Sequence, residues 1–370
     1  MRERILELIG VFFKLGCIAF GGPAAHIAMM EEEVIEKRKW MSPQRFLDLI
    51  GGTNLIPGPN STEMVMHCGY ERAGWPGLFA AGISFIFPAT VITGILAYFY
   101  TTYGSLPNVQ AFIYGIKPAV LAIIGAAILK LGKKGLKNNI LIILGIIFLA
   151  LALVGISEIL IMLLGGLLAA VFLYYRNKNT GLLAPILLLQ VNNGMVGLSS
   201  LKIFLSFLKV GSILYGSGYV LFAYLDAELV AKGLLTRLDL IDAIAAGQLT
   251  PGPVLSTATF IGWQLNGWEG AVAATLGIFL PSFVFVGILN PILEKIRSKL
   301  FLSYFLDAVN VAAVAVMLAV TIEMARETIV DWRTLVIAIL SFIWVFVLKR
   351  KNPILLVAGG SLLGYLLSFF

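Results

Sequence analysis

Four short breaks that contain Gly and Pro interrupt otherwise apolar stretches of this sequence. They read Phe20-Gly21-Gly22-Pro23, Pro57-Gly58-Pro59, Tyr215-Gly216-Ser217-Gly218 and Pro251-Gly252-Pro253. Proline removes a backbone donor and glycine frees the backbone, so a continuous helix is not expected at these points. Because proline favours the first position of a helix, Pro23 and Pro59 each predict the start of a half-helix. The free N–H groups and the positive dipole end of such a helix favour an anion.

Polar side chains that suit an oxygen-rich anion lie around these breaks. The predicted substrate-binding residues are all the break residues together with Lys14, Asn54, Asn60, Ser61, Thr62, Lys209, Ser256 and Thr257. Hydroxyl, amide and ammonium groups all donate hydrogen bonds, so the set predicts a site for a compact oxyanion. Simpler interpretations stay open, because a single break is often a kink or a close helix contact. A lysine near a helix end can also extend its charge to the membrane surface.

Four ionisable residues are candidates for moving a proton, namely Glu63, His26, Glu33 and Glu228. Glu63 lies just inside the half-helix that Pro59 opens, and an ionisable group at such depth predicts a function. An acid that complements the helix N-terminus is the alternative. Glu33 belongs to a mixed run of acids and bases, which is typical of a solvated face. The chain has 2 His and 2 Cys without ligand spacing, so neither a metal site nor a cofactor is expected.

The composition places these residues inside a membrane. Of the 370 residues, 59% are hydrophobic and 13% are charged, whereas soluble domains have about 45–50% apolar and about 25% charged residues. The formal net charge of +7 comes from basic residues in short clusters between apolar runs. That pattern predicts membrane topology and excludes nucleic-acid binding as its explanation. We therefore expect an all-α polytopic integral membrane protein of the cell membrane.

Eight apolar segments are predicted to span the bilayer, in two groups of four. They cover about 76–100, 109–131, 139–155 and 158–175, and then about 269–290, 303–323, 333–348 and 353–370. In the first group an uncharged loop at 101–110 precedes a lysine-rich loop at 130–137. In the second group the basic loop at 295–299 comes first and an acidic loop at 323–331 follows. The positive-inside rule therefore gives the two groups opposite orientations.

The breaks recur at a nearly constant spacing, which predicts two homologous halves. Lys14 and Gly16 match Lys209 and Gly211 at a shift of 195 (209 − 14), and the two Pro-Gly-Pro motifs match at 194 (251 − 57). The predicted domains are a first half at 1–180, a linking transmembrane segment at 181–199 and a second half at 200–370, in inverted topology. Two broken stretches precede each group of spans, and they are either interrupted spans or re-entrant hairpins.

These motifs resemble the chromate ion transporter family in its two-domain form. In the first half the resemblance lies in Phe13-Lys14-Leu15-Gly16, Phe20 to Ile27, Trp40-Met41-Ser42, Pro57-Gly58-Pro59 and Gly74-Trp75. In the second half it lies in Tyr215 to Gly218, Glu228, Pro251 to Thr257 and Gly267-Trp268. The resemblance implies a chromate exporter of the cell membrane, with sulfate as the structural analogue of its substrate.

The sequence thus predicts a secondary transporter that exports chromate by alternating access, driven by the membrane potential and in part by proton exchange. An importer or exchanger of sulfate or another small anion is the first alternative. A polytopic membrane enzyme is the second, although the spans show neither an Asp pair nor a Ser/His set for catalysis. The expected partners are a small oxyanion and the lipid bilayer, a homodimer stays open, and no nucleic acid is expected.

Overall fold

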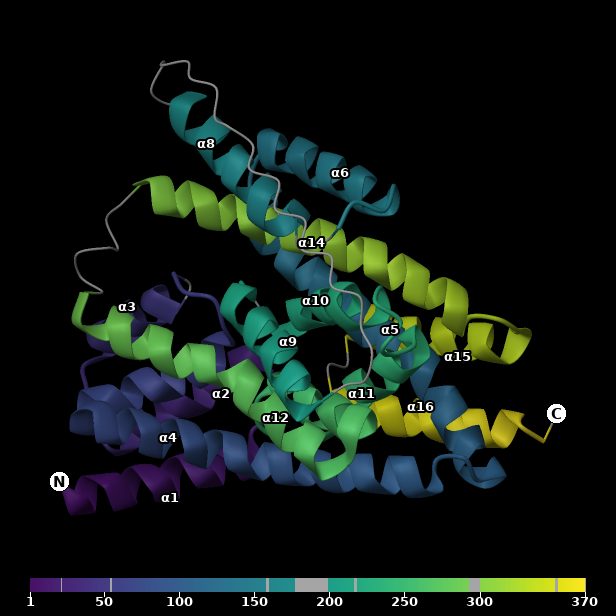
Figure 1. The fold of residues 1–370 in the computed structure, drawn as a ribbon, viewed down its shortest axis with the longest axis horizontal. Helices are drawn as coiled ribbons and strands as arrows, with labels where there is room; N and C mark the ends of the chain where they lie inside the picture. Colours follow the sequence, from purple (N-terminus) through teal and green to yellow (C-terminus); the bar gives the residue numbers. More distant parts are fainter. Residues whose placement is uncertain are drawn as a thin grey trace.

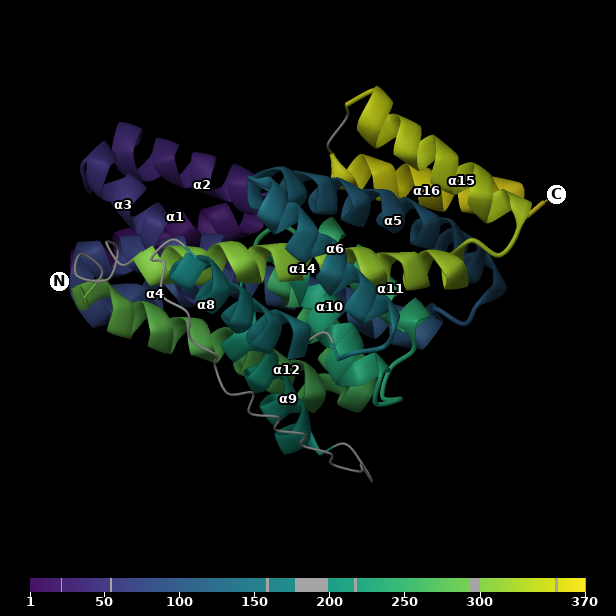
Figure 2. The ribbon, with the colours of Figure 1, turned by 90° about the horizontal axis from the view of Figure 1, so that it is seen from above.

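The computed structural model describes residues 1–20, 22–53, 55–157, 160–176, 199–215, 218–292, 300–349 and 352–369. Every regular element within these ranges is a helix (Figures 1 and 2). The first half contains α1 (Arg2–Ile18), α2 (Pro23–Glu31), η1 (Glu32–Lys37), α3 (Pro43–Thr53), α4 (Asn60–Tyr103), α5 (Pro107–Gly135), α6 (Asn139–Leu153), η2 (Ile161–Gly165) and α8 (Gly166–Arg176). The second half contains α9 (Ser200–Ile213), η3 (Gly218–Val220), α10 (Leu221–Leu225), η4 (Asp226–Val230), α11 (Arg237–Leu249), η5 (Val254–Ser256), α12 (Thr257–Leu289), η6 (Asn290–Ile292), α14 (Leu300–Thr328), α15 (Trp332–Phe342), η7 (Ile343–Val347) and α16 (Pro353–Leu367).

The helices cover the predicted spans. Among the described residues, four helical segments are long and apolar enough to cross a membrane: Asn60–Tyr103, Val109–Lys133, Val254–Leu289 and Tyr304–Thr328. Shorter apolar helices lie at Asn139–Leu153, Trp332–Val347 and Pro353–Leu367. The prediction of an all-α polytopic membrane protein is therefore confirmed. The linking segment at 181–199 lies almost entirely outside the described residues, so this segment and the domain boundaries beside it stay predictions.

Helix α4 doubles back on itself near its N-terminal end. It leaves helical geometry at Gly74, where φ is +62°, a value that glycine adopts without strain. Along a straight helix Gly69 and Gly77 would lie about 12 Å apart. A Cβ atom placed on Gly69 would instead lie 2.3 Å from the carbonyl oxygen of Gly77. The helix is therefore a short arm, residues 60–73, packed antiparallel on a full-length span.

Helix α12 repeats this reversal in the second half. Its turn is at Gly267, where φ is +55°, and 193 residues (267 − 74) separate it from the turn in α4. A Cβ atom on Gly262 would lie 2.2 Å from the carbonyl oxygen of Gly270. The hydroxyl groups of Thr259 and Thr275 are hydrogen-bonded across the two arms at 2.8 Å. Both halves therefore share one design, in which a short buried arm turns back into a long span.

The broken stretches of the first half form antiparallel hairpins. The arms of the first hairpin are joined by Arg38 with Glu7 at 3.1 Å, Lys14 with Glu33 at 3.6 Å, and His26 Nε2 with the Ala19 carbonyl at 3.0 Å. One residue number rises as the other falls, which is the register of an antiparallel pair. Helix α3 and the short arm of α4 are joined in the same way, by Arg45 and Glu71 at 2.8 Å.

The two halves run through the molecule in opposite directions. On the side of the C-terminus in Figures 1 and 2, α4 ends and α5 begins. The equivalent point, where α12 ends and α14 begins, lies on the side of the N-terminus. The helices are also exchanged between halves, since α5 packs against α15 and α16 while α14 packs against α6 and α8. Inverted topology is thus confirmed, and neither half buries its own spans without the other.

Helix α15 starts with a capping box that ties it to α5. The carboxylate of Asp331 accepts a hydrogen bond from the backbone N–H of Thr334 at 2.8 Å, and the Thr334 hydroxyl lies 3.2 Å from the Asp331 backbone nitrogen. The Tyr114 hydroxyl of α5 donates to the same carboxylate. Burial alone would raise the pKa of Asp331, but the bonds from Thr334 and Tyr114 lower it to about 2.

Replacing Asp331 with Ala should lower the free energy of unfolding by about 1 kcal/mol, the usual contribution of a helix N-cap. Asp331→Asn keeps the capping oxygen and should lose less. Since the pKa of Asp331 is lower in the folded state than the value of about 3.9 in an unfolded chain, its charge stabilises above about pH 4. This contribution is lost as the pH falls through about 2. Thermal unfolding in detergent as a function of pH measures both effects, and an Ala variant as stable as the wild type would contradict them.

Candidate functional site

The breaks meet in the buried centre of the molecule, through backbone hydrogen bonds that cross between the halves. The Gly58 N–H donates to the carbonyl oxygen of Leu214 at 2.6 Å, and the Gly252 N–H donates to that of Ala19 at 2.9 Å. These two bonds are equivalent under the repeat, because each Pro-Gly-Pro motif binds the first break of the opposite half. We call the described residues among 19–22, 57–59, 214–218 and 251–253 the junction.

The junction brings together residues that the sequence predicted for one site. Helix α2 begins at Pro23, as predicted, whereas α4 begins at Asn60 with Pro59 as its N-cap, one residue later than expected. The hydroxyl-bearing residues that follow the Pro-Gly-Pro motifs are all buried: Ser61, Thr62, Ser256 and Thr257. Phe20 is exposed, and Tyr215 is partly buried. Four predicted residues, Gly21, Asn54, Gly216 and Ser217, lie outside the described residues.

The junction is a closed contact in this conformation. The N–H groups of Gly58 and Gly252, two of the residues predicted to bind the anion, donate to carbonyl oxygens of the opposite half. The Thr257 hydroxyl donates to the Val254 carbonyl at 2.9 Å. An anion at the junction must therefore replace protein acceptors. Anion binding by Gly58 and Gly252 stays a prediction. The two residues do lie together at the contact between the halves.

Glu63 lies at the edge of the junction, fully buried. A Cβ atom on Gly58 would lie 2.0 Å from Glu63 Oε1 and 2.7 Å from Ser282 Oγ, and φ at Gly58 is +143°, a value that favours glycine. Ser282 is the polar neighbour of the carboxyl group, but no hydrogen bond of normal geometry joins them. The Thr62 hydroxyl is likewise buried without a hydrogen-bond partner among the described residues. An ionisable group with so few partners suits a proton carrier better than a structural ion pair.

The two lysines predicted to bind anion each contact a buried glutamate. Lys14 Nζ lies 3.6 Å from Glu33, and Lys209 Nζ lies 2.7 Å from Glu228. The glutamates are also 195 residues apart (228 − 33), so the pair itself is repeated. The lysine side chains are 63% and 51% exposed, so both ammonium groups stay accessible.

Each of these glutamates has a second lysine four residues further on. Lys37 contacts Glu33 at 3.0 Å, and Lys232 contacts Glu228. The hydrogen bond from Lys37 holds the pKa of Glu33 below its usual value. Glu33 is buried, so the interpretation of its charge run as a fully solvated face was wrong at this position. The π-helical turns η1 and η4 hold these carboxylates and point them back at the lysines.

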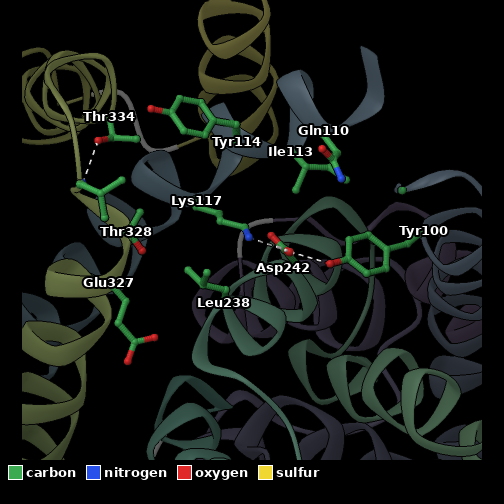
Figure 3. A pocket seen from close by; sticks show the side chains of 12 residues that line it. Tyr100, Gln110, Ile113, Tyr114, Lys117, Leu238, Asp242, Glu327, Thr328 and Thr334 are labelled. Carbon is green, nitrogen blue, oxygen red and sulfur yellow. Dashed lines mark hydrogen bonds and ion pairs between the residues drawn. The ribbon is translucent and has the colours of Figure 1, made fainter. Parts of the chain in front are cut away.

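A cavity of about 290 Å³ lies between the halves, away from the junction. It is lined by residues from α4, α5, α11, α14 and α15 (Figure 3). Asp242 of α11 reaches its wall and accepts a hydrogen bond from the Tyr100 hydroxyl at 2.7 Å. Lys117 Nζ lies 3.3 Å from the same carboxylate oxygen. Figure 3 shows the Lys117 ammonium and the Asp242 carboxylate facing each other across the two halves.

Sequence reasoning missed this charged pair. Lys117 lies inside the predicted span at 109–131, and Asp242 lies in one of the two broken stretches that precede the second group of spans. The rule that singled out Glu63, an ionisable residue at membrane depth, applies equally to both. Within the described part of the chain, no group of three or more His, Cys, Asp or Glu side chains could hold a metal ion. The candidate sites among the described residues are the junction, the repeated Lys/Glu contacts and this cavity.

Comparison with known proteins identifies the family. The model of the chromate transporter family matches the chain twice, over residues 6–170 and 201–365. A chromate transport protein of Pseudomonas aeruginosa is 29% identical over 97% of this chain and 92% of its own length. One from Cupriavidus metallidurans is 28% identical over 97% and 92%. A probable chromate transport protein of Synechococcus elongatus is 28% identical over 94% and 91%.

No solved structure is significantly similar to the chain. The two matches of the family model fall one in each half, which agrees with the inverted repeat seen in the helices. They also confirm the resemblance that the Gly and Pro motifs indicated. The chain belongs to the chromate transporter family of multi-pass cell-membrane proteins.

Proposed function

We propose that this protein exports chromate across the cell membrane by alternating access between its two halves. The observation that carries the proposal is the pair of crossed bonds, Gly58 with Leu214 and Gly252 with Ala19, which joins oppositely oriented halves at their breaks. Inverted repeats of this kind transport by moving one repeat against the other around a central site. The relatives that are named for chromate support a tetrahedral oxyanion as the substrate.

The proposed substrate site is the junction in an opened form. Movement of the halves would break one or both crossed bonds and free the N–H groups of Gly58 and Gly252. Buried hydroxyl groups at Ser61 and Ser256 would add donors from each half. Lys14 and Lys209 lie in the helices that lead to the junction, and each would guide the anion from one face. The dianion would thus meet a similar set of donors whether the site opens to the inside or to the outside of the cell.

Export of a dianion should be driven by the membrane potential. Moving one charge through 100 mV is worth about 2.3 kcal/mol, so a dianion leaving a negative interior gains roughly 4.6 kcal/mol, or about a 2,000-fold gradient. Proteoliposomes with a potassium diffusion potential at constant pH measure this directly, with labelled sulfate as the competing substrate. Chromate flux should reverse with the sign of the potential. A flux indifferent to that sign would exclude net charge movement and leave electroneutral exchange.

Glu63 is the proposed carrier of a counter-moving proton. Chromate flux in the wild type should therefore rise when the trans side is acidified, and this dependence should largely disappear in Glu63→Gln. The matched control is Glu36→Gln, which makes the same change at an exposed position. Equal pH dependence in the Glu63 variant and the wild type would return Glu63 to a structural role at the helix N-terminus.

Lys209→Ala should weaken chromate binding by about tenfold, the usual loss for a hydrogen bond to a charged group. Lys209→Arg should restore part of it. The double variant Lys209→Ala/Glu228→Gln separates two roles, because it also removes the carboxylate that Lys209 contacts. Binding should stay weak in the double variant if the lysine meets the anion. Recovery to the wild-type value would show that Lys209 serves only to neutralise Glu228. The control is Lys202→Ala, which makes the same change at the exposed start of α9.

A further inference from the structure

The cavity between the halves contains a cation that is only partly used. Lys117 stands within a membrane-spanning helix, where an ionised side chain is costly unless it is paired or functional. Its ammonium has three donor hydrogens. Asp242 Oδ2 takes one of them at 3.3 Å, and the side chain is 20% exposed toward the cavity. Lys117 therefore has donors left for a ligand that enters the cavity.

The carboxylate that faces Lys117 is also incompletely satisfied. Asp242 is 5% exposed, and its Oδ1 atom has no hydrogen-bond partner among the described residues. Its Oδ2 atom receives both the Tyr100 hydroxyl and Lys117. The ion pair therefore joins charges from different halves, while both the Lys117 ammonium and the Asp242 carboxylate keep unused hydrogen-bonding capacity. A purely structural buried ion pair needs those bonds to offset its desolvation.

Thr328, at the end of α14, also lines the cavity. Thr328 is 4% exposed, and its hydroxyl has no hydrogen-bond partner among the described residues. Figure 3 shows it on the same side of the cavity as Glu327, facing the region of Lys117. An oxygen-rich anion of small size would use the ammonium and this hydroxyl together. A metal cation would instead lie next to the ammonium and be repelled by it.

The other acids near the cavity each contact an arginine, and one arginine is shared by three of them. Glu327 lies 2.8 Å from Arg237, and Asp331 lies 3.2 Å from Arg333. Arg237 also holds Asp226 at 2.9 Å and contacts Glu323. Lys117 is the one base among the described residues that line the cavity.

We propose that this cavity is a second oxyanion-binding site, in which Lys117 binds the anion and Asp242 holds Lys117 when the anion is absent. The proposal rests on the proposed transport function and deepens it, because the second site lies beside the uncharged loop at 101–110, which the positive-inside rule places outside the cell. Asp242 acts there as a built-in competitor. Its return to Lys117 expels the anion, which a release site requires.

The two charges predict opposite effects on affinity, and this separates the proposal from a structural ion pair. Lys117→Ala should weaken binding at least about tenfold, and Lys117→Arg should retain most of it. Asp242→Asn removes the competitor and should tighten binding by about threefold or more, since the remaining repulsion is gone. If the pair only holds the halves together, both variants lower stability and neither strengthens binding.

The experiment needs a readout confined to this cavity, because the junction binds the same anion under the proposed function. Gln110 lines the cavity and is exposed, so Gln110→Cys, in a chain with Cys17 and Cys68 changed to Ala, places one thiol at the rim. Sulfate should slow the reaction of this thiol with N-ethylmaleimide, and the concentration for half protection gives the affinity. Lys117→Ala should raise that concentration, and Asp242→Asn should lower it.

Two matched controls make the same changes elsewhere. Lys133→Ala alters an exposed lysine at the far end of α5, and Asp48→Asn alters the repeat counterpart of Asp242 at a shift of 194 (242 − 48). In both controls, sulfate should protect the thiol at the rim as it does in the parent. Lys117→Ala leaves Asp242 without its cation, so Lys117→Ala/Asp242→Asn is added as a neutral pair. It should unfold near the temperature of the parent and still give no protection by sulfate.

Failure of this proposal and failure of the proposed function give different results. Protection that is unchanged by Lys117→Ala, or weakened by Asp242→Asn, overturns the second site even if proteoliposomes transport chromate. The expected changes in protection, found in a protein that moves neither chromate nor sulfate in proteoliposomes, would uphold the site and reject transport. Protection in the neutral double variant equal to that in the parent would also overturn the site.

Discussion

Broken backbone at membrane depth is the constraint on which the rest of this structure depends. Where a helix stops inside the bilayer, its N–H and C=O groups lose their helical partners and cannot turn to water. Here each half supplies what the other lacks, since Gly58 donates to Leu214 and Gly252 donates to Ala19. A half on its own would leave these groups unpaired. Mutual completion of the backbone therefore holds the two halves in register, and under the proposed mechanism their relative movement would expose these donors.

Close packing around the breaks follows from the same constraint. A Cβ atom on Gly16 would lie 2.6 Å from the carbonyl oxygen of Phe85, and one on Gly211 would lie 2.5 Å from that of Ile278. These are matching positions in α1 and α9, and each lets a hairpin arm touch the long span beside it. Transmembrane helices associate through the close packing of such small residues, because no hydrophobic driving force acts between apolar side chains that already lie in lipid. The hairpins are held at the depth at which the crossed bonds can form.

Much of this could be predicted from the sequence, because spans, breaks and repeats are properties of local composition and spacing. The half-helix after Gly22 and the burial of Glu63 follow from single segments. Contacts between distant segments could not be predicted in this way. Glu33 stands in a charged run, and its burial depends on η1 folding back toward Lys14. The repeat nevertheless contained a signal for the contact between Lys14 and Glu33. Both residues recur at a shift of 195 (228 − 33), as a lysine and a glutamate of the second half.

The pairing of charges bears on how a protein of such low polarity would admit a dianion under the proposed function. Each lysine discussed for anion binding lies beside a carboxylate, as Lys14 with Glu33, Lys209 with Glu228, and Lys117 with Asp242. An unpaired ammonium in a medium of low dielectric would be expensive to bury and, once occupied, slow to release a doubly charged ligand. A paired ammonium costs less to hold, and its own carboxylate competes with the anion. If the proposed sites bind the anion, this arrangement would make binding weak and reversible, which a transporter needs more than high affinity.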